Sequence, residues 1–303
     1  MSEHPLLIKY YDGLVEELNA RIPHALSGDA EAIHDARVAT RRLSAMLNVF
    51  EPQLSRGLRE RFQRGLKAFR RALGPMRDLD VMIAEFRRLP DSQMQVRDFL
   101  LENLQRARAE GRARMDKLNA PRLLGMLGSW WGLREELKEL SAGEMLRQSL
   151  SGQLDDFCRC AALHVSPSTA ETPQAVELNP HELRIAGKAL RYTLEATLAD
   201  GVAIPAPVIH SFKKMQDLLG TWHDLAVLSN QIMQICLEEE LALKDAERLR
   251  ACLTLMRRTT RRAAARLENF RTLWRQDGER LRQEIVLIIN QNPDAPPVTP
   301  ING

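Results

Sequence analysis

The chain has 303 residues, of which 44% are hydrophobic, enough for one large domain or two ordinary ones. Its 43 Lys and Arg residues nearly balance its 40 Asp and Glu residues, so the formal net charge is only +3. A binding site for a polyanion must therefore arise from local clustering of cations. Aromatic residues make up only 5% of the chain, which disfavours a protein that stacks single-stranded nucleic-acid bases on aromatic rings.

The ends of the chain and its cysteines favour a cytoplasmic protein without a membrane span. Residues 1–14 lack a basic segment followed by an apolar one, so we expect no signal peptide. The apolar run at 285–289 is far too short to cross a bilayer. We expect reduced, buried thiols, because Cys158 and Cys160 point in nearly opposite directions on a helix and cannot hold one metal ion together.

Apolar residues recur with helical period along almost the whole chain, and strand-like alternation is scarce. Gly and Pro residues mark plausible helix ends. We expect a break in the last helix near Asp277–Gly278 and a kink at Pro75. The polar, Pro-rich segment 166–180 is expected to be a loop, and 291–303 a disordered tail. The predicted helices cover 4–26, 29–50, 54–89, 92–118, 121–130, 142–165, 179–199, 205–237 and 240–290.

Two motifs occur twice, in the same order. HDARVATRRL begins at His34, and HELRIAGKAL begins 147 residues later at His181. LGPMRDLDVM begins at Leu73, and LGTWHDLAVL begins 146 residues later at Leu219. A repeat of about half the chain length indicates an internal duplication.

The duplication and the helical pattern together predict an all-α fold. Each half holds about four main helices in the same order, so we expect two similar antiparallel four-helix bundles related by pseudo-two-fold symmetry. The expected boundaries are 1–140 for the first half, 141–290 for the second and 291–303 for the tail.

The first helix of each repeat carries cations along one edge. With about 100° of rotation per residue, Arg37 and Arg41 lie at about 300° and 340° from His34, while Arg42 lies off this stripe at about 80°. Val38 and Leu43 form the apolar edge beside it. The second repeat has the same stripe, made of His181, Arg184, Lys188 and Arg191.

The next helix of each repeat carries a related stripe with the spacing i, i+3, i+7, i+10. A glycine takes the third position each time, and its missing side chain would let an extended ligand or another backbone approach closely. Asp78 and Asp224 follow the stripes and are expected to position an Arg or His. The stripe residues are Lys67, Arg70, Gly74 and Arg77 in the first half, and Lys213, Gln216, Gly220 and His223 in the second.

An Arg-rich helix face is usually just a solvated face, and a single His on a helix is more often packed than a ligand. Here, however, the cations recur at the same spacing on two helices of each half. Like charges at i, i+3 and i+4 destabilise a helix, so four such stripes favour an anion that offsets their repulsion. Because no motif for reading base edges is evident, the stripes fit a polymer of phosphates better than DNA or RNA.

The four motifs resemble those of the CHAD family, the histidine-containing α-helical domain, over roughly residues 5–285. The resemblance implies an all-α fold of two four-helix bundles and non-catalytic binding of inorganic polyphosphate in a basic groove or pore between the halves. It also implies association with polyphosphate granules. Many family members carry a fused triphosphate-tunnel domain, and this chain shows no strands for one, so no enzymatic activity or cofactor carries over.

Carried over by motif, the resemblance assigns thirteen polyphosphate-binding residues. The two halves depart from each other where Ala189 aligns with Arg42 and where Gln216 aligns with Arg70, so the basic lining is expected to be asymmetric. The Arg-rich stretches 106–114 and 257–262 are further candidates. The thirteen residues are His34, Arg37, Arg41, Arg42, Lys67, Arg70, Arg77, His181, Arg184, Lys188, Arg191, Lys213 and His223.

Two other functions remain open from the sequence. His34-Asp35 and His223-Asp224 are HD dipeptides, as in metal-dependent HD phosphohydrolases, which need several His and Asp ligands around a metal. The repeat aligns His223 with Arg77, whose charge would repel a metal. A helical nucleic-acid-binding protein is the second alternative, because basic stripes would also serve DNA or RNA phosphates.

Overall fold

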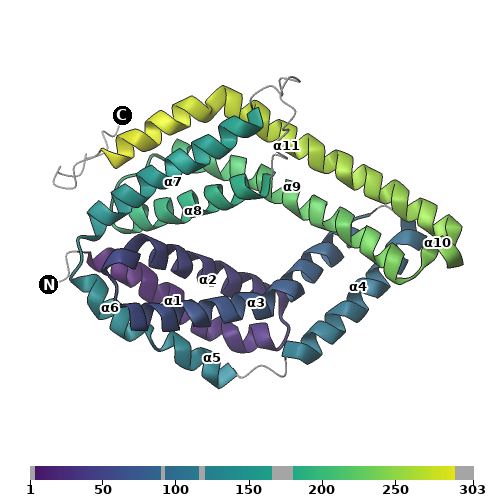
Figure 1. The fold of residues 1–303 in the computed structure, drawn as a ribbon, viewed down its shortest axis with the longest axis horizontal. Helices are drawn as coiled ribbons and strands as arrows, with labels where there is room; N and C mark the ends of the chain where they lie inside the picture. The colour runs from purple at the N-terminus through teal and green to yellow at the C-terminus, as the bar shows by residue number, and fades with distance from the viewer. Residues whose placement is uncertain (1–3, 90–92, 116–119, 166–179, 291–303) are drawn as a thin grey trace, which may run out of the picture.

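A computed structural model describes residues 4–89, 93–115, 120–165 and 180–290. These residues fold into helices without strands, which confirms the predicted all-α fold class (Figure 1). No helix in these ranges is both long enough and apolar enough to span a membrane. The predicted tail 291–303 and most of the predicted loop 166–180 lie outside the described residues, and Pro180 is already the first residue of a helix.

The first half begins with three helices that pack in sequence. α1 (Pro5–Leu26) and α2 (Ala30–Phe50) are joined by a tight turn, in which the Asp29 side chain caps α2 by accepting a hydrogen bond from the Ala32 amide at 2.7 Å. A short 3₁₀ turn (Glu51–Gln53) leads to α3 (Arg56–Arg87). Pro75 lies inside this helix, which continues on both sides of it.

The return from α3 is divided among α4 (Met94–Met115), α5 (Ala120–Leu127) and α6 (Trp130–Lys138). Sequence periodicity predicted a single short helix over 121–130, and the structure corrects this to two. Trp130 begins α6 and is buried, with its indole Nε1 donating to Asp12 of α1 at 2.9 Å. α1, α2, the first part of α3, α5 and α6 share one hydrophobic core.

The second half contains α7 (Ala142–Val165), α8 (Pro180–Ala199), α9 (Ala206–Glu238), the short α10 (Leu241–Lys244) and α11 (Ala246–Ile289). α7, α8, the first part of α9 and the last part of α11 enclose a second core. Ala142 and Leu146 of α7 and Ala196 of α8 pack into the first core, so the two cores adjoin. The pseudo-two-fold relation and the boundaries at 140 and 290 stay predictions.

The predicted break near Asp277–Gly278 is wrong. α11 continues through Asp277 and Gly278. Gly278 leaves room for the Trp274 ring, because a Cβ at this position would lie 2.7 Å from Cδ2 of Trp274. α11 begins at Ala246, and the carboxylate of the preceding Asp245 caps it by accepting from the Arg248 amide at 2.9 Å.

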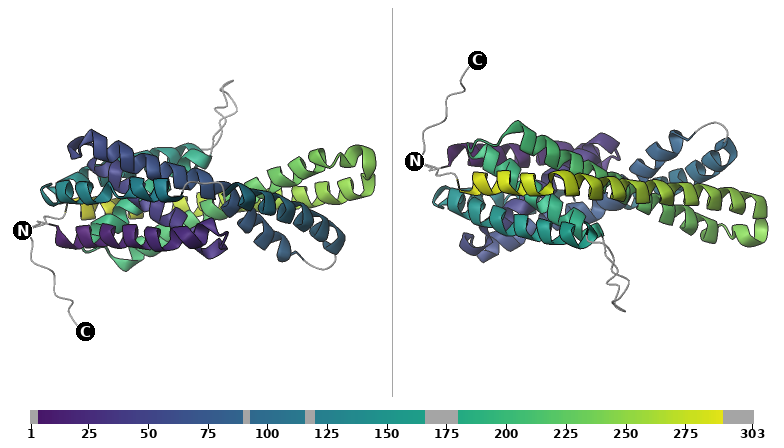
Figure 2. Two further views of the ribbon diagram at one scale, coloured as in Figure 1. Left: turned by 90° about the horizontal axis from the view of Figure 1, so that it is seen from below. Right: turned by 90° about the horizontal axis from the view of Figure 1, so that it is seen from above.

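Two long helical hairpins extend from the bundles on the same side and pack against each other (Figures 1 and 2). The end of α3 and α4 form one hairpin, and the end of α9, α10 and the start of α11 form the other; together they enclose a third core. Arg106 of α4 pairs with Glu239 at 3.1 Å, and the Arg248 guanidinium lies 4.7 Å from the ring centroid of Phe99. The halves are therefore joined both at the bundles and at the hairpin ends.

Candidate polyanion-binding cavity

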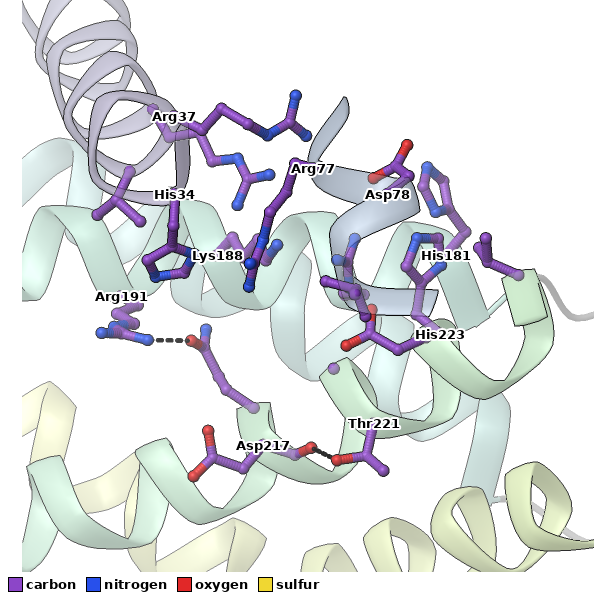
Figure 3. A pocket seen from close by; sticks show the side chains of 18 of the residues that line it. His34, Arg37, Arg77, Asp78, His181, Lys188, Arg191, Asp217, Thr221 and His223 are labelled. Carbon is purple, nitrogen blue, oxygen red and sulfur yellow. Dashed lines mark hydrogen bonds between the residues drawn. The ribbon is translucent and has the colours of Figure 1, made fainter. Parts of the chain in front are cut away.

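A cavity of about 600 Å³ lies between the two halves, and we call it the central cavity (Figure 3). α2 and α3 of the first half and α8 and α9 of the second supply its walls. Nine of the thirteen predicted residues line it: His34, Arg37, Arg41, Arg77, His181, Arg184, Lys188, Arg191 and His223. The stripes of α2 and α8 thus lie on one cavity, although 147 residues separate their equivalent positions.

Arg37 and Arg184 are equivalent in the two repeats and share an unusual feature. The Nε atom of each is buried and has no hydrogen-bond partner among the described residues. Leaving such a donor unsatisfied costs about 1–3 kcal/mol. Arg37 donates from Nη1 to the carbonyl oxygen of Arg70 at 3.1 Å, which fixes the guanidinium against α3. Both guanidiniums therefore retain donor capacity for an anion.

The crowding of cations perturbs the basic groups of the central cavity. Burial lowers the pKa of Lys188 to about 7, and repulsion by Arg41 and Arg184 adds to the shift. Burial, together with repulsion from Arg184 and His181, lowers the pKa of His223 to about 4. Burial and mutual repulsion thus disfavour the positive charge of these groups, which an anion would compensate.

Two histidines from different helices face each other at one side of the cavity. The rings of His181 and His223 lie 5.5 Å apart between centroids and are tilted by 35° (Figure 3). His34 stands apart from them on α2, and its pKa is lowered by burial and by the neighbouring Arg77. Neutral imidazoles can donate one hydrogen bond each to a ligand without adding to the charge repulsion.

Acidic side chains are the minority in the central cavity. Six Arg and Lys residues line it, against Asp78, Asp217 and Asp224. Neither Asp78 nor Asp224 forms an ion pair within 4.0 Å in the described part of the chain. Burial raises the pKa of both carboxyls even though the Arg37 and Arg184 guanidiniums act in the opposite direction. The predicted role of these two residues, positioning an Arg or His, stays a prediction.

The two stripe glycines have different surroundings. A Cβ on Gly74 would lie 3.0 Å from Nη1 of Arg37, so the space left by this glycine holds the guanidinium. A Cβ on Gly220 would meet no atom within 4 Å, and Gly220 lines the central cavity. Only the second of these glycines leaves room for a ligand.

Arg42 and Arg70 lie outside the cavity lining and bind protein groups. Arg42 donates from Nε to Glu195 of α8 at 2.7 Å, and Glu195 also accepts from Nε of Arg191 at 2.8 Å. Arg70 donates to the carbonyl oxygen of Thr40 and to the Ser44 hydroxyl. Arg42 therefore links the halves, while Arg70 links α3 to α2.

Lys67 and Lys213 also lie outside the central cavity. Lys67 is exposed on α3, and Lys213 lines a second hollow beside α9. The Arg-rich stretches contribute no residue to the central cavity either. Within the first stretch, Arg108 binds Asp80 at 2.6 Å and the Gly28 carbonyl oxygen at 2.7 Å, so it supports the fold.

Sequence reasoning did not assign several lining residues. Gln216 accepts from Arg191 at 3.5 Å and donates to the Gly187 carbonyl oxygen, so the residue that departs from the repeat still lines the cavity. Asp217, Thr221 and an apolar wall also line the cavity. The positions of Asp217 and Thr221 relative to Gly220 on the helix were the only sequence signal that could have indicated these two residues. The apolar wall consists of Val38, Val81, Met82 and Val227.

The HD dipeptides do not assemble a metal centre in the described residues. No group of three or more His, Cys, Asp or Glu side chains suited to a metal ion is found there. Asp35, the acidic member of the first dipeptide, pairs with Arg21 of α1 at 3.2 Å and does not line the cavity.

Comparisons with known proteins agree with the fold. The crystal structure of the CHAD domain from the plant Ricinus communis is 20% identical, with a TM-score of 0.58 over 96% of this chain and 93% of that one. PptA from Streptomyces chartreusis is 18% identical, with a TM-score of 0.63 over 91% of this chain and 100% of its own. A comparison with curated proteins gives no match.

The family itself is identified by sequence. The family model described as the CHAD domain matches residues 9–233, which include all four motifs and every residue that lines the central cavity. The chain therefore belongs to the CHAD family.

Proposed function

We propose that the protein binds inorganic polyphosphate in the central cavity without transforming it. The observation that carries this proposal is the cluster of six Arg and Lys side chains around one cavity, among them the equivalent Arg37 and Arg184, one from each half. Donors of this kind suit phosphate oxygens, because charge-assisted hydrogen bonds to a planar guanidinium are strong and directional. Family membership supports the same ligand class, since the CHAD resemblance implies polyphosphate.

The excess of cations supports a ligand with many negative charges. Six Arg and Lys side chains from four helices share one cavity with only three carboxylates. A single small anion would neutralise part of this charge, whereas a chain of phosphates carries one charge per repeating unit. The proposal includes a location at polyphosphate granules in the cytoplasm, where such chains would be the available ligand.

Nucleic acid is the second candidate, and the composition of the cavity wall disfavours it. Proteins that hold single strands combine cations with aromatic rings on which bases stack. No Phe, Tyr or Trp side chain is among the described residues that line the central cavity. The wall therefore matches the backbone of a nucleic acid and offers little to its bases.

Titration of the purified protein with long-chain polyphosphate at two salt concentrations tests the proposal, with RNA of matched charge in parallel. We expect tight binding that weakens steeply with salt, because each neutralised phosphate releases a counterion. Polyphosphate should displace RNA readily, and RNA should not displace polyphosphate.

Three results would contradict the proposal. Equal affinity for both polymers would leave a general polyanion surface, and no binding would leave the stripes without this ligand. Phosphate release during the titration that stops on adding EDTA would favour the phosphohydrolase alternative.

A further inference from the structure

A second hollow, of about 490 Å³, lies beside the central cavity on the second half, and we call it the outer pocket. Its basic side chains are His210, Lys213 and Lys214 of α9 and Arg266 of α11. All four are exposed, and none forms an ion pair or hydrogen bond within the described ranges. The outer pocket is thus a cluster of basic side chains without protein counter-charges apart from Asp217.

The outer pocket adjoins the central cavity. Asp217 and Thr221 line both, and Figure 3 shows them on α9 at the edge of the central cavity. Lys213 precedes Gly220 by seven residues, so the two lie within about 20° of each other on α9 and about 10 Å apart along its axis. The stripe predicted from the sequence therefore begins in the outer pocket and ends in the central cavity.

Gly220 lines the central cavity next to Thr221, which lines both hollows, and it leaves open space beside α9. No atom lies within 4 Å of the position where a Cβ would stand. An extended chain can therefore cross α9 at this point close to its backbone.

The first half lacks this arrangement at the equivalent positions. The Arg37 guanidinium fills the space beside Gly74. Ala68 takes the place of Lys214 and packs against the first core, and α5 covers α3 one turn earlier, where a Cβ on Gly65 would lie 3.0 Å from Cβ of Met126. The second half has one continuous helix, α11, in place of α4 to α6, and Arg266 of α11 lines the outer pocket.

We infer that the outer pocket is a second subsite for the same polyanion. A phosphate chain long enough to leave the central cavity passes over Gly220 and places further phosphates among Lys213, Lys214 and Arg266. Chains therefore leave the cavity through the second half. This inference rests on the proposed function and adds a dependence on chain length that the central cavity alone does not give.

The test compares tripolyphosphate, which is short enough to stay in the central cavity, with long-chain polyphosphate. The variant Lys214→Ala/Arg266→Ala removes two charges of the outer pocket, and Arg61→Ala/Arg64→Ala removes two exposed charges of α3 as a matched control. For the outer-pocket variant we expect about tenfold weaker binding of the long chain at low salt, and a change within about twofold for tripolyphosphate. The control should change neither affinity by more than about threefold.

A second variant has the opposite sign and so excludes misfolding as the cause. Asp217→Asn removes the carboxylate that lies where the two hollows meet, and we expect it to tighten long-chain binding about threefold. Equal losses of long-chain affinity in the outer-pocket and control variants would overturn the second subsite while leaving the proposed function intact. Failure of the unaltered protein to bind either phosphate chain would overturn both.

Discussion

The two halves carry the same motifs on frames that differ after the third helix. In the second half α11 returns along α9 as one helix of 44 residues. In the first half α4, α5 and α6, of 22, 8 and 9 residues, cover the equivalent path. Among the residues that the structure describes, only the motif helices α2, α3, α8 and α9 line the central cavity. The comparison shows that the motif helices form the cavity. The segments that follow, α4 to α6 in the first half and α11 in the second, determine which side chains lie on the outer faces of α3 and α9.

The same contrast appears at single residues within the cavity. Arg37 is fixed by Arg70 and fills the space at Gly74, whereas the space at Gly220 is open. In the first half a guanidinium thus fills the space beside the stripe glycine. In the second half this space is open, and we propose that a phosphate chain leaves the cavity there. Four sets of variants would break or sharpen this comparison.

The largest effect is expected when both halves lose their unpartnered arginine. Arg37→Ala/Arg184→Ala should weaken long-chain polyphosphate binding by about 100-fold or more, since each charge-assisted hydrogen bond contributes about 1.5–3 kcal/mol. Calorimetric titration measures the affinity, and circular dichroism should show unchanged helicity. The two single variants tell whether the halves contribute equally.

The matched control for that variant is Arg257→Ala/Arg261→Ala, which removes two exposed charges of α11 outside both hollows. The assignment of the cavity as the binding site would be contradicted if Arg37→Ala/Arg184→Ala left the affinity unchanged. The same small loss as in this control would also contradict it.

The second effect is a pH dependence of the affinity for polyphosphate, which arises from Lys188 in the second half. Because the pKa of Lys188 is about 7 in the free protein, its amine is charged below pH 7 and binding takes up no proton. Above pH 7, binding of phosphate must return the proton, so the affinity should fall about tenfold per pH unit until the raised pKa of the complex is reached. The measurement is long-chain affinity between pH 6 and 9.

Lys188→Arg serves as the control for that profile, because a guanidinium stays charged throughout this range. The variant should flatten the profile between pH 7 and 8. A flat profile in the unaltered protein would show that Lys188 does not contact the anion.

The third effect compares the two stripe glycines. Gly220→Leu should leave the melting temperature unchanged or raise it, because its side chain enters open space and glycine is the weaker helix former by about 1 kcal/mol. It should weaken long-chain binding about fivefold by narrowing the passage. Gly74→Leu should lower the melting temperature, because it displaces the Arg37 guanidinium. Equal stability changes at the two positions would refute the difference described here.

The smallest effect is expected at the contact between the halves. Glu195→Gln weakens the links to Arg42 and Arg191, so urea denaturation should show a loss of about 1 kcal/mol. Long-chain binding should become two- to threefold tighter, since Arg191 is released and a negative charge near the cavity is lost. A weaker affinity instead would mean that Glu195 positions Arg191 for the ligand.

Much of the fold was predictable because its signals are local. Helical period located the motif helices to within a few residues, and the spacing of His34, Arg37 and Arg41 placed them on one edge of α2. The repeat then suggested that the stripes of the two halves would meet. The split between α5 and α6 was missed, since it depends on Trp130 reaching Asp12 across the bundle.

The rest of the site depends on contacts between distant parts of the chain. Arg42 lies off the stripe and was assigned to the ligand through the family resemblance, but it binds Glu195, which lies 153 residues away. Likewise, no local pattern reveals that Arg37 occupies the space at Gly74, or that Arg266 of α11 lies opposite Lys214 of α9. Motif spacing finds the cations, and only the packing shows which of them are already engaged.

A crystal structure of the protein with bound long-chain polyphosphate tests the central claim most directly. We predict electron density for a phosphate chain in the central cavity, with phosphate oxygens within hydrogen-bond distance of the guanidiniums of Arg37 and Arg184. Phosphates bound only on other basic surfaces, such as the Arg257–Arg262 segment of α11, with the central cavity free of phosphate, would contradict it.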